Sequence, residues 1–323
     1  MNRRLFRSID EACGRFAPCA LSIGNFDGVH VAHRALIDVT VKQATQNRLT
    51  PSALTFDPHP AAVVAPERKP ELICTLGQRI QLLFEAGAGQ VFVLPFTPDV
   101  ARMSPREFVS QILVNCLQTK VVVVGESFLF GRGQAGNAEV LRALGAEFGF
   151  ESQFLKPVAV RGEIVSSSAI RRHISRGNVS RAGRLLGRCF SVAGPVVSGH
   201  GIGSKQTVPT LNIHPIAGQV LPRGVFVTET IDQNTSRRWP SITNVGIRPT
   251  FGGDELTIET YLLSPLQQDS PAHIQIQFRR FIRSEQRFSG AQDLRSQILK
   301  DISRAQAYWR RVSKLLQPTA SLY

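Results

Sequence analysis

Four β-branched residues in a row, Val121 to Val124, constrain the fold of this chain more than any other stretch. Such a run is typical of a strand buried on both faces, as in a parallel sheet covered by helices. Shorter apolar runs precede it, and segments with helical spacing separate them. This alternation predicts a doubly wound α/β domain in the first half of the chain. The expected strands are 20–24, 52–56, 90–96 and 120–126, and the expected helices are 31–47, 76–87, 104–118 and 137–148.

The sequence pattern changes at about residue 186. Short strand-like stretches are now divided by Gly, Pro, Asn and Asp, which is the pattern of a small antiparallel barrel. An amphipathic helix over 291–316 should follow it, with Leu294, Ile298, Ile302 and Ala305 at helical spacing. We therefore expect two domains, 1–185 and 186–323. The expected barrel strands are 191–199, 224–231, 241–246, 256–263 and 274–282.

Composition narrows the class of protein. A chain of 323 residues with 42% hydrophobic and 19% charged residues can form a globular protein with a substantial core. Lys and Arg outnumber Asp and Glu by 38 to 24, and the net charge of +14 favours polyanionic partners, from nucleic acid and anionic lipid to small phosphorylated ligands. The basic residues are spread along the whole chain, which argues against nucleic acid. No apolar run approaches 18 residues, so we expect no membrane span.

The cysteines and the first residues indicate the compartment. Five cysteines without metal-ligand spacing are expected to be reduced thiols in a cytoplasmic protein. The first sixteen residues contain basic side chains but no apolar core, so we expect no signal peptide.

Two of the seven histidines, His30 and His33, lie three residues apart in "GNFDGVHVAH" (24–33). Residues at this spacing share a helical face, so both rings can point together from the first turn of a helix. A helix N-terminus favours bound phosphate, and two imidazole donors there would stabilise charge that grows at phosphorus. Two ordinary helix histidines are the alternative, whereas a metal pair lacks a third ligand nearby. Asp27 could instead orient the turn through backbone hydrogen bonds.

A second candidate site lies in "SGHGIGSKQTVPTLNI" (198–213). Closely spaced glycines, among them Gly199 and Gly203, suit a loop whose amides wrap the phosphates of ATP, although many such loops are plain turns. Thr210 and Asn212 are two residues apart, so on a strand they face the same way. Their neutral oxygens could share one Mg²⁺ ion with ATP phosphates.

"GNFDGVHVAH" resembles the HxGH signature of the adenylyltransferase half of the prokaryotic bifunctional riboflavin kinase/FAD synthetases, with Ala32 where that family usually has Gly. Three further stretches agree with the family in order, and Ser127 stands where Asp or Asn is usual. The resemblance implies a Rossmann-like nucleotidyltransferase domain. The stretches are "FDPHP" (56–60), "VVVGESFLFGRGQAGN" (122–137) and "VSSSAIRRHISRGNVSRAGRLLGR" (165–188).

The reaction implied by this resemblance is attack of the FMN phosphate on the α-phosphorus of ATP, giving FAD and pyrophosphate. Positioning and charge stabilisation dominate catalysis of such transfers. A plain helix cap for the serines and a surface salt bridge for Arg171 are the alternatives. By resemblance, His30, His33 and Asn25 hold the α-phosphate, and Ser167, Ser168 and Arg171 receive the departing phosphates.

The second half resembles a riboflavin kinase. Pro209, Thr210 and Asn212 match the family's PTxN signature, and segments 221–228, 243–253, 258–263 and 281–305 follow in the family's order. Departures are Thr207-Val208 in place of Gly-Phe, and "SPLQQDSPAH" (264–273) in place of an Asp-rich segment. By resemblance, Glu259 is the general base for the riboflavin 5′-hydroxyl. A cross-strand charge pair is the alternative for Glu259. The resemblance also implies that Thr210 and Asn212 bind Mg²⁺ and that Arg283 contacts the flavin.

Together these features predict a cytoplasmic enzyme with two successive activities, from riboflavin to FMN and from FMN to FAD. Its expected ligands are ATP, riboflavin, FMN and FAD, with no nucleic-acid or membrane partner. One alternative is an adenylyltransferase whose barrel has lost its kinase activity. Another is a basic nucleic-acid-binding regulator on the same fold, although aromatic residues for base stacking total only 7%.

Overall fold

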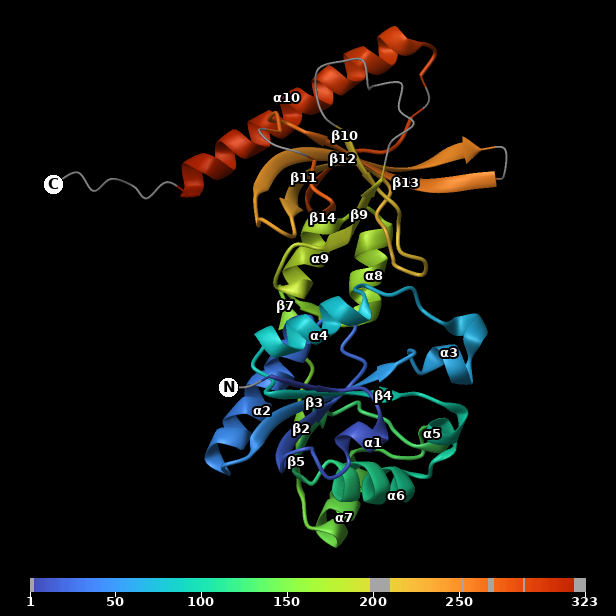
Figure 1. The fold of residues 1–323 in the computed structure, drawn as a ribbon, viewed down its shortest axis with the longest axis vertical. Helices are drawn as coiled ribbons and strands as arrows, with labels where there is room; N and C mark the ends of the chain where they lie inside the picture. The colour runs from blue at the N-terminus through green and yellow to red at the C-terminus, as the bar shows by residue number, and fades with distance from the viewer. Residues whose placement is uncertain (1–2, 198–209, 251–252, 267–269, 287, 317–323) are drawn as a thin grey trace, which may run out of the picture. The chain divides into compact units, whose positions relative to one another are not determined.

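The structure is a computed structural model that describes residues 3–197, 210–250, 253–266, 270–286 and 288–316. The chain divides into two compact units, Met1–Ser167 and Ser168–Tyr323. Each unit is built around its own sheet (Figure 1). The change of sequence pattern at residue 186 coincides with the end of helix α9 (Val179–Leu186), which precedes the first barrel strand.

The first unit contains a six-stranded parallel sheet in the order β1-β4-β3-β2-β5-β6 (Figure 1). The four expected strands are all present, and β1 and β6 extend the sheet at its two edges, where short or polar strands give little sequence signal. The chain reverses its direction of winding between β2 and β5, so the switch point of this sheet lies there. The strands are β1 (Arg4–Phe6), β2 (Cys19–Ile23), β3 (Thr50–Asp57), β4 (Gln90–Pro95), β5 (Thr119–Gly125) and β6 (Glu151–Leu155).

Helices pack on both faces of this sheet and bury its apolar residues in separate clusters. Val122 and Val124 point into one cluster and Val121 and Val123 into another, as expected for a strand covered on both faces. The main helices are α2 (Val31–Gln46), α4 (Leu76–Glu85), α6 (Pro105–Glu107) with η2 (Phe108–Cys116), and α7 (Ala138–Phe148). Short elements complete the unit: α1 (Ile9–Ala12), α3 (Ala61–Val64), η1 (Pro66–Arg68), α5 (Pro98–Arg102), η3 (Arg132–Gln134), β7 (Ala159–Val160) and β8 (Glu163–Ile164).

Two expectations for this unit are wrong. The single α-helix expected over 104–118 is one α-helical turn followed by a π-helical segment, η2, a wider winding that local sequence pattern does not reveal. The cysteines are not all reduced, because Cys13 and Cys116 form a disulfide across 103 residues of sequence. The ends of α1 and η2 meet only through the tertiary fold. Cys19 remains a thiol, and burial raises its pKa to about 12.

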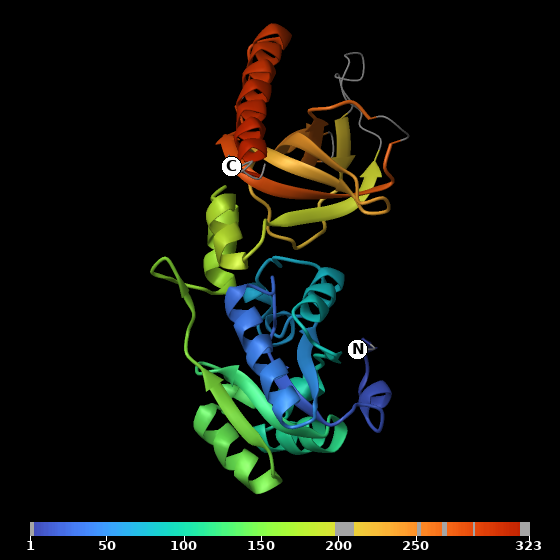
Figure 2. The same ribbon diagram turned by 90° about the vertical axis from the view of Figure 1, so that its left-hand side faces the viewer.

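The second unit is a closed six-stranded antiparallel barrel in the order β10-β13-β12-β11-β14-β9, which confirms the expected architecture (Figure 2). Its interior combines an aromatic cluster around Phe226 and Phe278 with a continuous chain of buried hydroxyl groups. Helix α8 (Ser167–Ser175) precedes α9. The strands are β9 (Ser191–Val197), β10 (Thr210–Ile213), β11 (Gly224–Asp232), β12 (Arg238–Thr250), β13 (Gly253–Leu262) and β14 (His273–Arg283).

The last helix, α10 (Ala291–Leu316), runs along the outside of the barrel within the expected bounds (Figure 2). Ala305 and Ile302 pack against Val225 and neighbouring barrel residues. Leu294 and Ile298, expected on the same buried stripe, are each 41% exposed, so the stripe packs only in the second half of the helix. No helix in the described part of the chain has both the length and the apolar character needed to cross a membrane.

Candidate active sites

The first candidate site begins in the turn between β2 and α2, at the switch point of the sheet. This turn contains three residues with positive φ: Phe26 (48°), Gly28 (82°) and Val29 (37°). A positive φ is rare for a β-branched residue and persists only where surrounding contacts impose it. Asp27 supplies such contacts, because both of its carboxylate oxygens accept from the backbone N–H of Ile73 at 3.0 Å. The turn-orienting role considered for Asp27 is therefore present in the structure.

The structure brings His30 and His33 together as expected. Their rings stack with centroids 3.6 Å apart and an interplanar angle of 12°. His30 is the N-cap of α2 rather than part of its first turn, and its Nδ1 accepts from the backbone N–H of His33 at 3.3 Å. Since Nδ1 is an acceptor, the proton of a neutral His30 ring lies on Nε2. His30 can therefore donate from Nε2 to an oxygen bound at the start of α2.

His33 is held in its uncharged form. Burial lowers its pKa well below the usual value, and repulsion from His30 and from the Arg79 guanidinium lowers the pKa further. Its Nδ1 is buried and has no hydrogen-bond partner in the described part of the chain. A neutral imidazole stacked on a second histidine at a helix N-terminus forms a site that can donate hydrogen bonds to phosphate.

Asn25 and His59 form the adjoining part of this site. The Asn25 amide nitrogen and His59 Nε2 lie 3.3 Å apart, while His59 Nδ1 accepts from the backbone N–H of Ala61 at 3.2 Å. His59 follows β3 in the "FDPHP" stretch, where the Asp57–Pro58 peptide is cis. His59 was not among the residues expected at this site from the sequence. The signal was present, because His59 lies two residues beyond the end of β3, a strand that ends at the same sheet edge as β2.

The residues expected to receive the departing phosphates lie around the start of α8. The Ser167 hydroxyl donates to the backbone oxygen of Asp27 at 3.0 Å, which places Ser167 at the histidine turn. Ser168 is exposed and Arg171 is half-buried one turn later in α8. These two belong to the second compact unit, whereas the histidines belong to the first.

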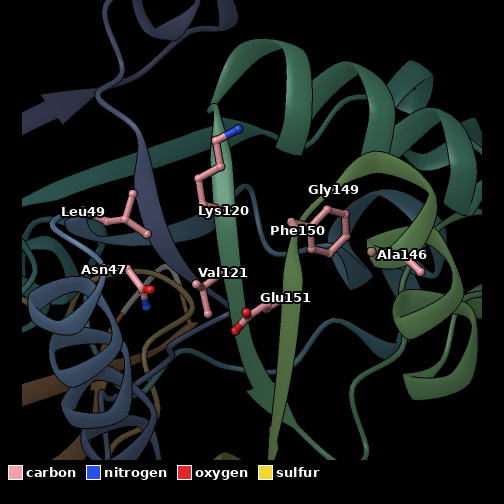
Figure 3. Close-up of a pocket in the computed structure, with 9 residues that line it drawn as sticks. Asn47, Leu49, Lys120, Val121, Ala146, Gly149, Phe150 and Glu151 are labelled. Carbon is pink, nitrogen blue, oxygen red and sulfur yellow. The ribbon is translucent and has the colours of Figure 1, made fainter.

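A pocket of about 460 Å³ occupies the other end of the sheet (Figure 3). Its lining includes Asn47 at the end of α2, Lys120 in β5 and Glu151 at the start of β6. Helix α2 has sixteen residues, so its two ends are about 24 Å apart. This pocket is therefore distinct from the histidine site.

The second candidate site lies on the barrel, where strand register brings three polar residues together. Asn212 in β10 lies directly opposite Glu259 in β13, and Glu259 lies opposite Asn244 in β12. Side chains of directly opposed residues point to the same face, with Cβ atoms about 5 Å apart. Glu259 forms no ion pair or hydrogen bond with another described residue. The cross-strand charge pair considered as the alternative for Glu259 is therefore absent among the described residues. Asn244 was not predicted from the sequence, because its neighbours depend on strand register.

The polar oxygens at this face fit a hard divalent cation. The Asn212 Oδ1 is buried and has no hydrogen-bond partner in the described part, and Thr210 is exposed two residues earlier. No cluster of three His, Cys, Asp or Glu side chains suited to a metal occurs among the described residues. A cation here would therefore rely on neutral oxygens and on nucleotide phosphates, as Mg²⁺ often does. Gly199 and Gly203, expected to contact ATP, lie outside the described residues.

Arg283, the expected flavin contact, is engaged within the barrel unit. Its Nε donates to Asp301 Oδ2 at 2.8 Å, and its Nη1 donates to the Ser284 backbone oxygen at 3.0 Å. Asp301 is 3% exposed and also accepts from Gln297 at 2.9 Å. These bonds hold Arg283 between the end of β14 and α10.

A parallel sheet with paired histidines at its switch point, joined to a closed antiparallel barrel, defines a two-domain phosphate-transferring class of protein. The family model described as FAD synthetase matches residues 15–169, and the one described as riboflavin kinase matches residues 186–309. The bifunctional riboflavin kinase/FMN adenylyltransferase of Escherichia coli K12 is 34% identical over 284 residues, covering 88% of this chain and 90% of that protein. The protein of the same name from Pseudomonas fluorescens is 31% identical over 306 residues, which cover 94% of this chain and 97% of that protein.

The chain therefore belongs to the bifunctional riboflavin kinase/FMN adenylyltransferase family. This confirms both the resemblance and the fold class predicted from the sequence. A crystal structure of a Streptococcus pneumoniae protein, described as a macrolide-efflux protein, superposes with a TM-score of 0.84 at 25% identity. The superposition covers 95% of this chain and 99% of that protein, so the two-domain architecture is shared along nearly the whole length.

Proposed function

We propose that this protein converts riboflavin to FMN and FMN to FAD, using one ATP in each reaction. Residues 1–185 form the proposed adenylyltransferase domain and residues 186–323 the proposed riboflavin kinase domain. The observation that carries the proposal is the stacked pair His30 and His33 at the start of α2, in a chain whose barrel sets Asn212 opposite Glu259. Family membership supports both activities.

In the proposed adenylyl transfer, a phosphate oxygen of FMN attacks the α-phosphorus of ATP and pyrophosphate leaves. His30 donates from Nε2 to an α-phosphate oxygen, and the neutral ring of His33 lies against it. Removing one such donor raises a barrier by about 3 kcal/mol. The free N–H groups of α2 add positive potential, and Asn25 completes this side. Ser167, Ser168 and Arg171 at the start of α8 are proposed to receive the pyrophosphate.

In the proposed kinase reaction, Glu259 takes the proton of the riboflavin 5′-hydroxyl as its oxygen attacks the γ-phosphorus of ATP, and ADP leaves. A general base must be free to approach the hydroxyl. Glu259 meets this requirement because it is half-buried and makes no ion pair with a described residue. We propose that Gly199 and Gly203 contact the ATP phosphates and that Arg283 contacts the flavin.

Kinases and nucleotidyltransferases of these families use a divalent metal ion. We propose that the ion at the barrel is Mg²⁺, held by Asn212 Oδ1, the Thr210 hydroxyl and the phosphates of ATP. When bound, it would neutralise charge on the transferred phosphoryl group. The protein's own contribution is the buried Asn212 oxygen, which accepts no hydrogen bond from any residue that the structure describes.

The ligands in this proposal are ATP, riboflavin, FMN and FAD, and the proposed compartment is the cytoplasm. No nucleic acid or membrane is needed for either reaction.

A chromatographic assay with riboflavin and Mg-ATP tests the proposal. We expect FMN to form first and FAD to follow from it. Accumulation of FMN without FAD would contradict the assignment of the first unit. Formation of FAD from supplied FMN, but never from riboflavin, would contradict the kinase assignment and favour an adenylyltransferase with an inactive barrel.

A further inference from the structure

Arg79 in α4 is a fully buried cation without a carboxylate partner among the described residues. The residue is 1% exposed. Its Nη1 donates to Thr55 Oγ1 at 3.3 Å and to the backbone oxygen of Phe56 at 3.0 Å, and both acceptors are neutral. Its Nε is buried and lacks a hydrogen-bond partner in the described part. Burying an unpaired charge is strongly unfavourable, so this guanidinium is unusual as a purely structural group.

The hydrogen bonds of Arg79 lead directly to the histidine site. Thr55 Oγ1, which accepts from Arg79, itself donates to the backbone oxygen of Asn25 at 3.0 Å. Asn25 in turn contacts His59 through its side chain. One guanidinium therefore joins α4 to the end of β3 and, through Thr55, to the turn that carries His30.

The charge of Arg79 also acts electrostatically on the histidine site, because it lowers the pKa of His33. Two groups act electrostatically on His33: His30 within its own turn and Arg79 from α4. A positive potential that keeps an imidazole neutral also attracts an anion placed beside it. The anions that the adenylyl-transfer reaction brings to this turn are the phosphates of ATP and FMN.

We propose that Arg79 is a positioning residue of the adenylyltransferase site, whose unpaired charge next to the histidine turn is matched by the phosphates of bound ATP. This inference rests on the proposed adenylyltransferase function. Arg79 acts through Thr55, Asn25 and the histidines and is not itself a catalytic residue. A purely structural role would be served as well by an apolar side chain of similar length, which avoids burying a charge.

Three variants test the proposal in the full-length protein. Arg79→Met removes the charge and keeps an unbranched, flexible side chain, whereas Arg79→Lys keeps the charge. Arg48→Gln is the matched control, because Arg48 is an exposed arginine of the same unit beyond the end of α2. For each variant we would measure kcat and KM for FAD formation from FMN, the unfolding midpoint without nucleotide, and riboflavin phosphorylation as an internal control.

We expect Arg79→Met to lower kcat/KM for ATP by about 10- to 100-fold, by analogy with residues that orient metal ligands through hydrogen bonds. Its unfolding midpoint should be unchanged or higher, because an unpaired buried charge has been removed. Arg79→Lys should recover most of the lost activity, and Arg48→Gln should behave as wild type. Riboflavin phosphorylation should be the same in all four proteins.

Titration of the His33 imidazole by NMR gives a readout that does not depend on activity. The pKa of His33 should rise in Arg79→Met and stay low in Arg79→Lys and Arg48→Gln. Wild-type activity in Arg79→Met with an unchanged His33 titration would overturn the proposal. So would a parallel loss of activity and stability that lysine does not rescue, which would identify a structural role. A wild-type protein that made no FAD would refute the proposed function, while the His33 titration would still decide the role of Arg79.

Discussion

Breaking the Cys13–Cys116 disulfide should destabilise the first unit alone. The bond closes a loop of 103 residues that contains the histidine turn and the end of β3. In the chain-entropy description, a cross-link over about 100 residues stabilises the folded state by about 4.7 kcal/mol. For a unit of this size each kcal/mol corresponds to about 2–4 °C, so Cys13→Ser should lower the unfolding midpoint by about 10–20 °C.

The distribution of tryptophan allows the two units to be followed separately. Both tryptophans, Trp239 and Trp309, lie in the second unit, so their fluorescence reports the barrel, while calorimetry records both transitions. Reductant should shift one calorimetric transition and leave the fluorescence transition in place. Cys13→Ser should abolish the effect of reductant, which controls for action at the other cysteines. Equal midpoints for oxidised and reduced wild-type protein would refute the reasoning.

The remaining predictions concern the two candidate sites. Glu259→Gln should abolish FMN formation while FAD synthesis from supplied FMN continues. His30→Ala should lower FAD formation about 10²- to 10³-fold while FMN formation continues. Loss of both activities in either folded variant would contradict the presence of two independent sites. Because the pKa of His33 is lower in the folded than in the unfolded state, the unfolded state binds the extra proton as pH falls below about 6.5. The first unit should therefore lose stability below this pH, and His33→Gln should lessen that loss in unfolding experiments between pH 5 and 8.

The sequence predicted the layers of the fold because the burial patterns are local. The valine run and the alternating apolar stretches each identify a strand from a few neighbouring residues, and α10 has the expected bounds. The edge strand β1 was missed because three residues carry too little periodicity. The disulfide was missed because only tertiary packing brings Cys13 to Cys116.

The sequence predicted the paired histidines, since a spacing of three before a helix places both rings at the helix start. It did not predict the neighbours that set their chemistry. Arg79 is 46 residues beyond His33 in sequence, and the opposition of Glu259 to Asn212 and Asn244 depends on strand register. Contacts between distant segments therefore decide what these sites can do.

The segment just before α4, Ile73 to Thr75, helps to fix the conformation of the histidine turn, although it lies more than 40 residues further along the chain. The backbone N–H of Ile73 donates to the Asp27 carboxylate. This bond holds the turn in which Phe26 and Val29 adopt positive φ. Thr75 then caps α4 in a capping box, which fixes where the helix begins. Arg79 follows one turn later and reaches the end of β3. Since one short segment sets both the turn and the buried charge, a change in the start of α4 should alter His30 and Asn25 together rather than either alone.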